Sequence, residues 1–233
     1  MGTVEEIYQK FLYQMGEENF LIPYQRACKN IEQELELINR EYSRRLGRSF
    51  ISQIICRIKT PESCLKKMIK KKYTIERQMA QEQLSDIAGI RVICNFLDDV
   101  YKLAEIIRND KVFEIVKTKD YVKKPKASGY QSLHVIVFAP AGGNEKKKVE
   151  IQIRTQAMNL WAVVEHHCVY KKGNYEKNEF EKDLRECART IYKIDKKMLL
   201  IREKMEMAQE ESQKPHSKLT GHQACSAAEQ RET

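Results

Sequence analysis

Two segments in the second half of the chain alternate apolar and polar residues, as a strand does when it presents two different faces. They are residues 130–138 and 148–154. Their polar positions are Tyr130, Ser132 and His134 in the first segment, and Glu150, Gln152 and Arg154 in the second. A solvated sheet face is the ordinary interpretation of such a pattern. Solvated faces favour Lys, Glu and Thr, however, so this mixture of stacking, proton-transferring and anion-binding side chains indicates a site.

A divalent cation site is a second chemistry that these residues can support. Asp86 directly precedes the apolar segment 87–94, and Glu150 lies on the polar face just described. Hard cations such as Mg²⁺ are held by one or two carboxylates together with substrate phosphates. The alternative for Asp86 is a turn or capping role, which is the commoner one for a lone Asp before a strand.

Phosphate binding is predicted by basic and hydroxyl residues around a helix start. Thr60-Pro61 is a typical start, because Thr caps helices and Pro fits the first helical position. Free backbone N–H groups and nearby cations at such a position suit a polyphosphate. The cluster consists of Arg57, Lys59, Ser63 and Lys67. The alternative is a basic, solvated helix, and neither glycine-rich phosphate motif, G-x-x-x-x-G-K or G-x-G-x-x-G, occurs in the chain.

The segment 123–130 is basic and ends in an aromatic residue. A purine base can stack on Tyr130 while lysines such as Lys126 contact its phosphates. The alternative is a flexible surface loop that leads into a strand.

These residues need a sheet bordered by helices to bring them together. Apolar, β-branched segments predict strands at 87–94, 112–121, 130–138 and 148–154, with a turn at 139–144. Helical spacing and capping signals predict helices at 4–15, 23–46, 60–72, 98–109, 156–170 and 176–209, with Gly47 as the stop of the second. The expected fold is therefore α/β (α+β), a mixed sheet of four or five strands flanked by helices, with helical extensions at both ends.

One detail of this scheme needs a structural explanation. Strict alternation places Asp86 and Arg91 on opposite faces of one strand. We expect either a bulge at Gly89 or a strand that begins after Asp86.

The composition limits the class of protein. The chain has 233 residues, 42% of them hydrophobic, and a net charge of +9, which supports a folded domain with anionic partners such as nucleotides, nucleic acid or acidic membrane surfaces. The sequence contains neither an apolar run long enough for a transmembrane helix nor a secretory signal. Seven cysteines without a C-x-x-C pair favour reduced thiols, and hence a cytoplasmic protein.

Five motifs occur in an order that resembles a known family. They are RIKTPESCLKK at 57–67, DIAGIR at 86–91, KASGYQSLH at 126–134, EIQIRT at 150–155, and AMNLWA at 157–162 followed by Glu165-His166. Together they resemble the synthetase domain of RelA/SpoT-type (p)ppGpp synthetases, and the last resembles the short, stand-alone branch, the small alarmone synthetases. The resemblance covers residues 20–205. It departs at Ser128, where many long members have Asn.

The resemblance implies a nucleotidyltransferase-like fold and a GTP pyrophosphokinase reaction. Pyrophosphate would pass from ATP to the ribose 3′-hydroxyl of GDP or GTP, with release of AMP. The implied cofactor is Mg²⁺, held by Asp86 and Glu150, and Glu150 would also activate the 3′-hydroxyl.

The resemblance also assigns the two nucleotides. The ATP-binding residues would be Arg57, Lys59, Ser63, Lys67 and Arg91, with the two arginines enclosing the adenine. The GTP- or GDP-binding residues would be Lys126, Tyr130, His134, Gln152 and Asn159, with Tyr130 stacked on the guanine.

The same resemblance shapes the expected organisation. We expect an N-terminal helical extension at 1–22, the (p)ppGpp synthetase domain at 23–175, a C-terminal helix at 176–211 and a disordered tail at 212–233. The chain contains no His-Asp dipeptide, so the family's hydrolase chemistry is expected to be absent and synthesis alone to remain. The terminal helices are expected to support a homotetramer, as small relatives do.

Two alternatives stay open at this point. One is a different nucleotidyltransferase, although the chain lacks a paired D-x-D near its sheet. The other is a nucleotide- or RNA-binding regulatory protein without catalysis, which the positive charge supports; single-stranded RNA is also compatible with a synthetase.

Overall fold

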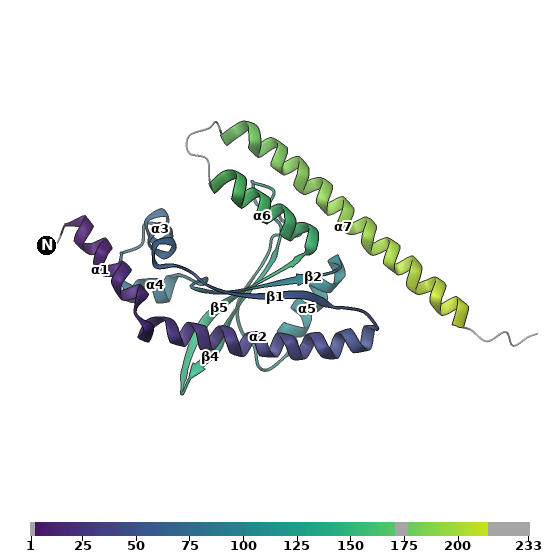
Figure 1. Ribbon diagram of the computed structural model, residues 1–233, viewed down its shortest axis with the longest axis horizontal. Coiled ribbons are helices and arrows are strands. Elements are labelled where there is room, and N and C mark those ends of the chain that lie inside the picture. Colours follow the sequence, from purple (N-terminus) through teal and green to yellow (C-terminus); the bar gives the residue numbers. More distant parts are fainter. Residues whose placement is uncertain (1–2, 171–176, 214–233) are drawn as a thin grey trace, which may run out of the picture. The chain divides into compact units, whose positions relative to one another are not determined.

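The computed structural model describes residues 3–170 and 177–213 (Figure 1). The chain divides into two units, residues 1–199 and 200–233, and the sheet lies in the first. Its five strands are β1 (Ile51–Ile58), β2 (Ala88–Cys94), β3 (Glu114–Asp120), β4 (Leu133–Gly142) and β5 (Glu145–Thr155). Their order is β1-β2-β5-β4-β3, with β2 and β5 parallel and the other neighbours antiparallel. The predicted mixed sheet is confirmed.

Along the chain, helices lie before the first strand, between strands and after the last strand. They are α1 (Val4–Gly16), α2 (Glu18–Leu46), α3 (Pro61–Lys71), α4 (Arg77–Gln83), α5 (Leu97–Asn109), α6 (Gln156–Tyr170) and α7 (Lys177–Gln213). The predicted caps are confirmed: Gly47 ends α2 with a left-handed φ of 62°, and the Thr60 side chain accepts a hydrogen bond from the Ser63 N–H at the start of α3. Each cap satisfies backbone groups that the helix itself leaves unpaired.

Two elements were not predicted, and the start of a third was placed wrongly. Strand β1 lies at the sheet edge and carries polar residues, so its sequence lacks a continuous apolar run. Helix α4 has seven mostly polar residues, RQMAQEQ, which are too few to show a helical period. Helix α2 begins before Pro23, because Phe20 and Tyr24 on either side of the proline are buried and anchor the first turns.

The apolar core lies between the sheet and α2, which runs along one face of it (Figure 1). Val149, Ile151 and Ile153 are fully buried on that face, as their alternation predicted. Each such side chain contributes about 1.5–3 kcal/mol through burial. The opposite face of the central strands is therefore left for the polar residues.

The hairpin of β4 and β5 is longer and tighter than predicted. Strand β4 begins at Leu133 rather than Tyr130 and continues to Gly142, so the turn is confined to Gly143 and Asn144. Gly142 and Gly143 both have positive φ, at 121° and 55°, a conformation that glycine adopts without steric cost. This turn sets the register between the two strands that carry most of the polar face.

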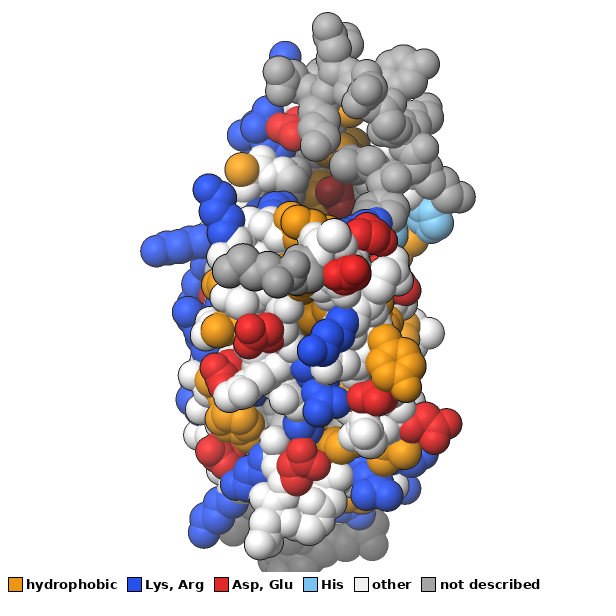
Figure 2. Space-filling model, turned by 90° about the vertical axis from the view of Figure 1, so that its left-hand side faces the viewer, with side chains coloured by type: hydrophobic (Ala, Val, Ile, Leu, Met, Phe, Trp, Pro, Cys, Tyr) orange, Lys and Arg blue, Asp and Glu red, His pale blue; other side chains and the backbone are white. Residues whose placement is uncertain are grey.

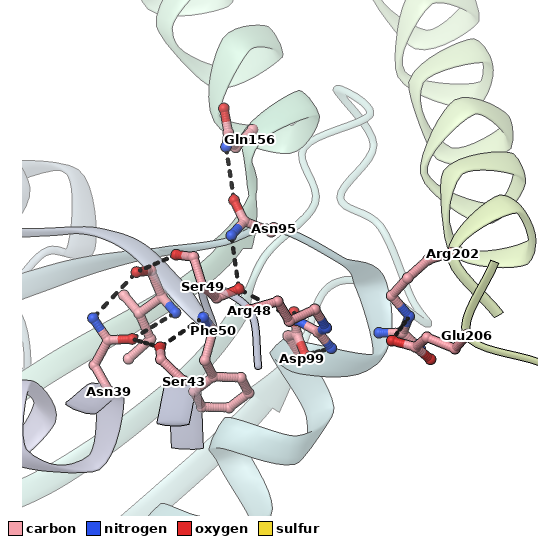
Figure 3. Close-up of polar contacts among 11 residues, drawn as sticks. Asn39, Ser43, Arg48, Ser49, Phe50, Asn95, Asp99, Gln156, Arg202 and Glu206 are labelled. Carbon is pink, nitrogen blue, oxygen red and sulfur yellow. Dashed lines mark hydrogen bonds and ion pairs between the residues drawn. The ribbon is translucent and has the colours of Figure 1, made fainter. Parts of the chain in front are cut away.

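A network of polar contacts joins the C-terminal half of α2, the start of β1 and the start of α5 (Figure 3). Asn39 and Ser43 of α2 accept hydrogen bonds from the backbone N–H groups of Ile51 and Phe50 at 2.9 and 3.0 Å. Arg48 forms a two-pronged ion pair with buried Asp99 of α5, at 2.8 and 2.9 Å. These contacts hold the entry of β1 against α2 and α5.

The C-terminal helix is partly integrated into the sheet domain. In the first unit, the indole N–H of Trp161 donates to the Leu184 carbonyl at 2.8 Å, and Thr155 donates to Asp195 at 2.7 Å. Helix α7 continues to Gln213, so residues 212 and 213 belong to a helix and not to the predicted tail. The remainder of that tail and the predicted boundary at 175 lie outside the described residues, and the other domain boundaries stay predictions.

Asp195 provides a stability test with a defined pH dependence. Burial raises the pKa of its carboxyl to about 6, although the Thr155 hydrogen bond works against this. The protonated form is thus favoured in the folded state, so stability is fully present below the unfolded pKa of about 4 and falls as pH rises through 6. We expect the free energy of unfolding of Asp195→Asn to exceed that of wild type by about 1–3 kcal/mol at pH 7.5. This difference in stability should disappear below about pH 4.

The measurement is urea unfolding across pH, with Asp183→Asn on the exposed face of the same helix as the control. A variant less stable than wild type at every pH would contradict the burial of an ionised carboxylate there.

Candidate active site

The strand registers bring distant residues into two adjacent rows on the polar face. In one row Gly89 of β2 lies between Arg57 of β1 and Glu150 of β5. In the next, Arg91, Gln152 and His134 lie side by side on β2, β5 and β4. Since paired residues share a face, these predicted residues lie together. Because residue 89 is glycine, no side chain covers the sheet surface between Arg57 and Glu150.

The conflict over Asp86 is resolved by the start of the strand. Strand β2 begins at Ala88, and its pairing with β1 runs from Ile93 to Ala88 without a register shift, so Gly89 carries no bulge. Asp86 therefore lies in the segment before the strand and does not follow its alternation.

Asp86 is enclosed by two lysines from the predicted phosphate cluster. Lys59, which follows β1, and Lys67 of α3 each place Nζ 2.8 Å from a different oxygen of the Asp86 carboxylate. Burial alone would raise the pKa of Asp86, but the two ammonium groups outweigh it, and the pKa lies below its ordinary value. Ser63 lies in the first turn of α3, where its hydroxyl is 3.0 Å from that of Thr60. The start of α3 thus combines two cations with a carboxylate at the N-terminal end of a helix.

Glu150 lies at the centre of the polar face and is buried, with 6% of its surface exposed. Its Oε1 is 3.1 Å from Nδ1 of His134, and its Oε2 accepts a hydrogen bond from Gln152 at 2.8 Å. Burial opposes ionisation, but His134 and Gln152 outweigh it, so the pKa of Glu150 lies below its ordinary value. The carboxylate is thus ionised and held at both oxygens.

Two observations bear on whether Asp86 and Glu150 fit a shared cation. The charge of Asp86 acts to raise the pKa of Glu150, so the two carboxylates lie close enough to interact. Both oxygens of Asp86 are ion-paired with lysines at 2.8 Å, so the carboxylate is ionised and already serves as a ligand for cations. Two carboxylates that leave further positions for phosphate oxygens match the donor set of Mg²⁺.

Tyr130 lies beside Glu150 in an aromatic and cationic setting. The ammonium of Lys126 is 4.5 Å from the centre of its ring, and the guanidinium carbon of Arg154 is 5.0 Å away. Its hydroxyl is 2.8 Å from Nε2 of His134. Burial and the neighbouring Arg154 lower the pKa of Lys126, partly offset by Glu150. The predicted guanine-binding residues Lys126, Tyr130 and His134 therefore form one cluster.

The segment that carries Tyr130 is held in place by the C-terminal helix. Gly129 has a φ of 95°, and a Cβ there would lie 2.9 Å from Cβ of Ala188. Gln131 donates to the Ala188 carbonyl at 3.3 Å. Only glycine permits this close approach, which fixes the backbone next to Tyr130.

Three predicted residues, Arg57, Asn159 and Arg91, make few contacts with the rest of the site. Arg57 is exposed on the edge strand. Asn159, in the first turns of α6, has a single side-chain contact among the described residues, 3.5 Å from Arg154. Arg91 is half-buried, and burial, then the charge of Arg154, lowers its pKa.

Two residues near the site were given no role from the sequence. Tyr121 follows β3, and its ring packs edge-on against His134 at 5.1 Å and under Lys126 at 4.8 Å. Arg154 was placed on the polar face without a function, and it contacts three site residues. The alternation in β5 could have identified Arg154, whereas nothing in the sequence signals Tyr121.

Residues 3–170 and 177–213 contain no cluster of three or more metal-ligating side chains and no helix of the length and apolarity that crossing a membrane requires. On the face shown in Figure 2, Lys and Arg side chains are interspersed with acidic and apolar ones. On that face the positive charge does not gather into one continuous patch.

Comparison with known proteins identifies the relatives of the chain. Residues 56–175 match a family model described as the region found in RelA / SpoT proteins. The GTP pyrophosphokinase YwaC of Bacillus subtilis is 35% identical over 192 residues, covering 81% of this chain and 91% of that protein. The GTP pyrophosphokinase YjbM of the same organism is 33% identical over 195 residues, covering 82% and 91%.

A solved structure agrees with these sequence matches. Small alarmone synthetase 1 from Bacillus subtilis, bound to its product pppGpp, superimposes with a TM-score of 0.74 at 33% identity. The match covers 80% of this chain and 96% of that one.

Proposed function

This chain belongs to the RelA/SpoT family, and we propose how its own residues carry out the pyrophosphokinase reaction of the small alarmone synthetases. The chain is a GTP pyrophosphokinase that makes (p)ppGpp by transferring pyrophosphate from ATP to the ribose 3′-hydroxyl of GDP or GTP, with release of AMP. The observation that supports the residue roles is the strand register, which pairs Glu150 with Gly89 next to Arg57 and pairs Gln152, two residues further on, with His134.

The ATP side of the site is formed by β1, β2 and α3. Arg57 and Arg91 enclose the adenine, and Lys59, Ser63 and Lys67 bind the phosphates at the start of α3. In the structure the two lysines neutralise Asp86. When ATP binds, they turn toward its phosphates, where they stabilise the negative charge that grows on the transferred group.

The acceptor side is formed by the segment before β4 and by β5. Tyr130 stacks on the guanine, and Lys126, His134, Gln152 and Asn159 contact the acceptor nucleotide. Glu150 is ionised and directed by two hydrogen bonds, so it can accept the proton of the 3′-hydroxyl as that oxygen attacks the β-phosphorus. Two nucleotides fixed on one rigid sheet supply the in-line alignment that the transfer needs.

Mg²⁺ is the proposed cofactor, held by Asp86 and Glu150 with phosphate oxygens of the substrate. When bound, it neutralises charge on the transferred pyrophosphate and on the leaving group.

The setting in the cell follows from the family. We propose a cytoplasmic homotetramer that acts in the stringent response and can also bind single-stranded RNA. Apolar side chains exposed on the terminal helices support self-association, among them Tyr13 on α1 and Ile194 and Met198 on α7.

Product analysis tests the reaction type. Incubation with ATP, Mg²⁺ and GDP or GTP is expected to release AMP in step with a guanosine 3′-diphosphate product. Release of inorganic pyrophosphate would instead indicate nucleotidyl transfer. Unchanged ATP with either acceptor would favour a binding protein.

Tyr130→Ala tests the stacking role. Base stacking on an aromatic ring contributes about 1–3 kcal/mol, so we expect KM for GDP or GTP to rise about 5- to 150-fold and KM for ATP to change little. Tyr130→Phe keeps the stacking ring but loses the hydroxyl that contacts Arg154 and His134, so its acceptor KM should rise far less than in the alanine variant even where kcat falls. Equal losses for both substrates in the alanine variant would argue against stacking.

A further inference from the structure

Arg154 is a buried cation whose role the proposed function leaves open. It is only 4% exposed, and within the described part of the chain no carboxylate forms an ion pair with it. Its charged neighbours include Arg91 and Lys126, whose pKa values its own charge lowers. Burying an arginine among cations without a directly paired anion is unfavourable for the fold, so a structural role alone does not account for it.

The contacts of Arg154 lead to Glu150 by two routes. Nη2 donates to the hydroxyl oxygen of Tyr130 at 2.7 Å and to Oε1 of Gln152 at 2.9 Å. From Tyr130 the chain passes through His134 to Oε1 of Glu150, and from Gln152 it passes directly to Oε2. The five side chains form a closed ring with the guanidinium at one end and the catalytic carboxylate at the other.

The direction of each hydrogen bond in this ring follows from Arg154, which can only donate. Gln152 must present its carbonyl to the guanidinium, so its N–H₂ points to Glu150. Tyr130 accepts from Arg154 and has its own proton left for Nε2 of His134. A neutral His134 then carries its proton on Nδ1, where it donates to the ionised Glu150.

We propose that Arg154 is a positioning residue for the acceptor half of the reaction: it orients both hydrogen-bond chains that end on Glu150, and it holds the Tyr130 ring by the same contact. This inference rests on the proposed function. Arg154 touches neither substrate in this account and acts through Tyr130, Gln152 and His134.

The test compares Arg154→Met with the same substitution at Arg48, a half-buried arginine that pairs with a buried carboxylate outside the site. Methionine fills much of the same volume without the charge, so we expect Arg154→Met to keep or raise Tm while kcat falls about 100-fold and KM for ATP stays within about threefold, since misplaced catalytic groups lower kcat by such factors. The control is Arg48→Met, which leaves Asp99 without its two-pronged partner. It should lower Tm and leave kcat per folded molecule near wild type.

A second variant separates geometry from charge. Lysine keeps the positive charge but lacks the planar fork that reaches Tyr130 and Gln152 together. We expect Arg154→Lys to remain nearly as impaired as Arg154→Met. Recovery to near wild-type kcat would show that charge alone is required and would overturn the proposal.

A spectroscopic readout without nucleotide distinguishes this inference from the proposed function. ¹⁵N NMR of the histidines, with His134 assigned by its loss in His134→Gln, should show the Nδ1-protonated form in wild type. In Arg154→Met it should show a mixture of the two neutral forms. An unchanged His134 signal, or unchanged kcat in Arg154→Met, would overturn the positioning role. If the wild-type protein is inactive, the proposed function is contradicted. The NMR comparison then still tests whether Arg154 orients the five hydrogen-bonded side chains.

Discussion

Glu150→Gln is expected to lower kcat by at least about 1,000-fold, because it removes the proposed proton acceptor and one of two carboxylates for Mg²⁺ at once. Glutamine has nearly the same shape and its carbonyl can still accept from His134. Its N–H₂ then faces the N–H₂ of Gln152, which costs about one hydrogen bond and leaves the fold in place. The measurement is steady-state turnover with saturating ATP and GDP, together with the thermal unfolding curve.

Glu114→Gln is the matched control for this variant. Glu114 is an exposed carboxylate of the same sheet, paired only with Lys146 at 2.7 Å among the described residues. It should turn over like wild type. A Glu150→Gln enzyme within about tenfold of wild type would remove Glu150 from the proton transfer, since general-base catalysis contributes about 100- to 10,000-fold.

Asp86→Asn is expected to give the second large loss, about 100- to 1,000-fold in kcat, as a charge-stabilising partner of the transferred group is lost. Its effect on ATP differs from that of Glu150. Lys59 and Lys67 lose their anion, so both are free to bind phosphate, and the affinity for ATP without Mg²⁺ should rise.

The measurements for this variant are ATP binding with and without Mg²⁺, and kcat over a range of Mg²⁺ concentrations. If kcat of the variant saturates at a higher Mg²⁺ concentration than kcat of the wild type, Asp86 is supported as a Mg²⁺ ligand. Wild-type kcat with an unchanged Mg²⁺ requirement would show that Asp86 serves only to pair the lysines.

Much of the sheet could be predicted from local pattern. Val149, Ile151 and Ile153 alternate with polar residues, and that period alone places them in the core and Glu150 on the other face. The helix caps at Gly47 and Thr60 could also be predicted from the sequence, because each cap depends only on neighbouring residues.

The contacts within the site could not be predicted, because they depend on register between strands. His134 lies opposite Gln152 because the chain turns at Gly143 and Asn144 and the strand pairing shifts between Pro140 and Gly142. The predicted turn at 139–144 leaves that register undetermined. Strand β1 was missed since an edge strand needs no continuous apolar run. The hydrogen bond between Thr155 and Asp195 forms because one side of a long helix packs against the sheet. The helical period of the sequence does not show which side that is.

The most direct test of the account follows the phosphates themselves. Wild-type protein is incubated with Mg²⁺, ATP labelled in its γ-phosphate, and either GDP or 3′-deoxy-GDP. Transfer of an intact pyrophosphate to the 3′-oxygen predicts that label enters the guanine nucleotide from GDP, with one AMP for each label transferred, and that 3′-deoxy-GDP receives none. Label in both acceptors, or label released as free pyrophosphate or phosphate without entering GDP, would contradict the central claim.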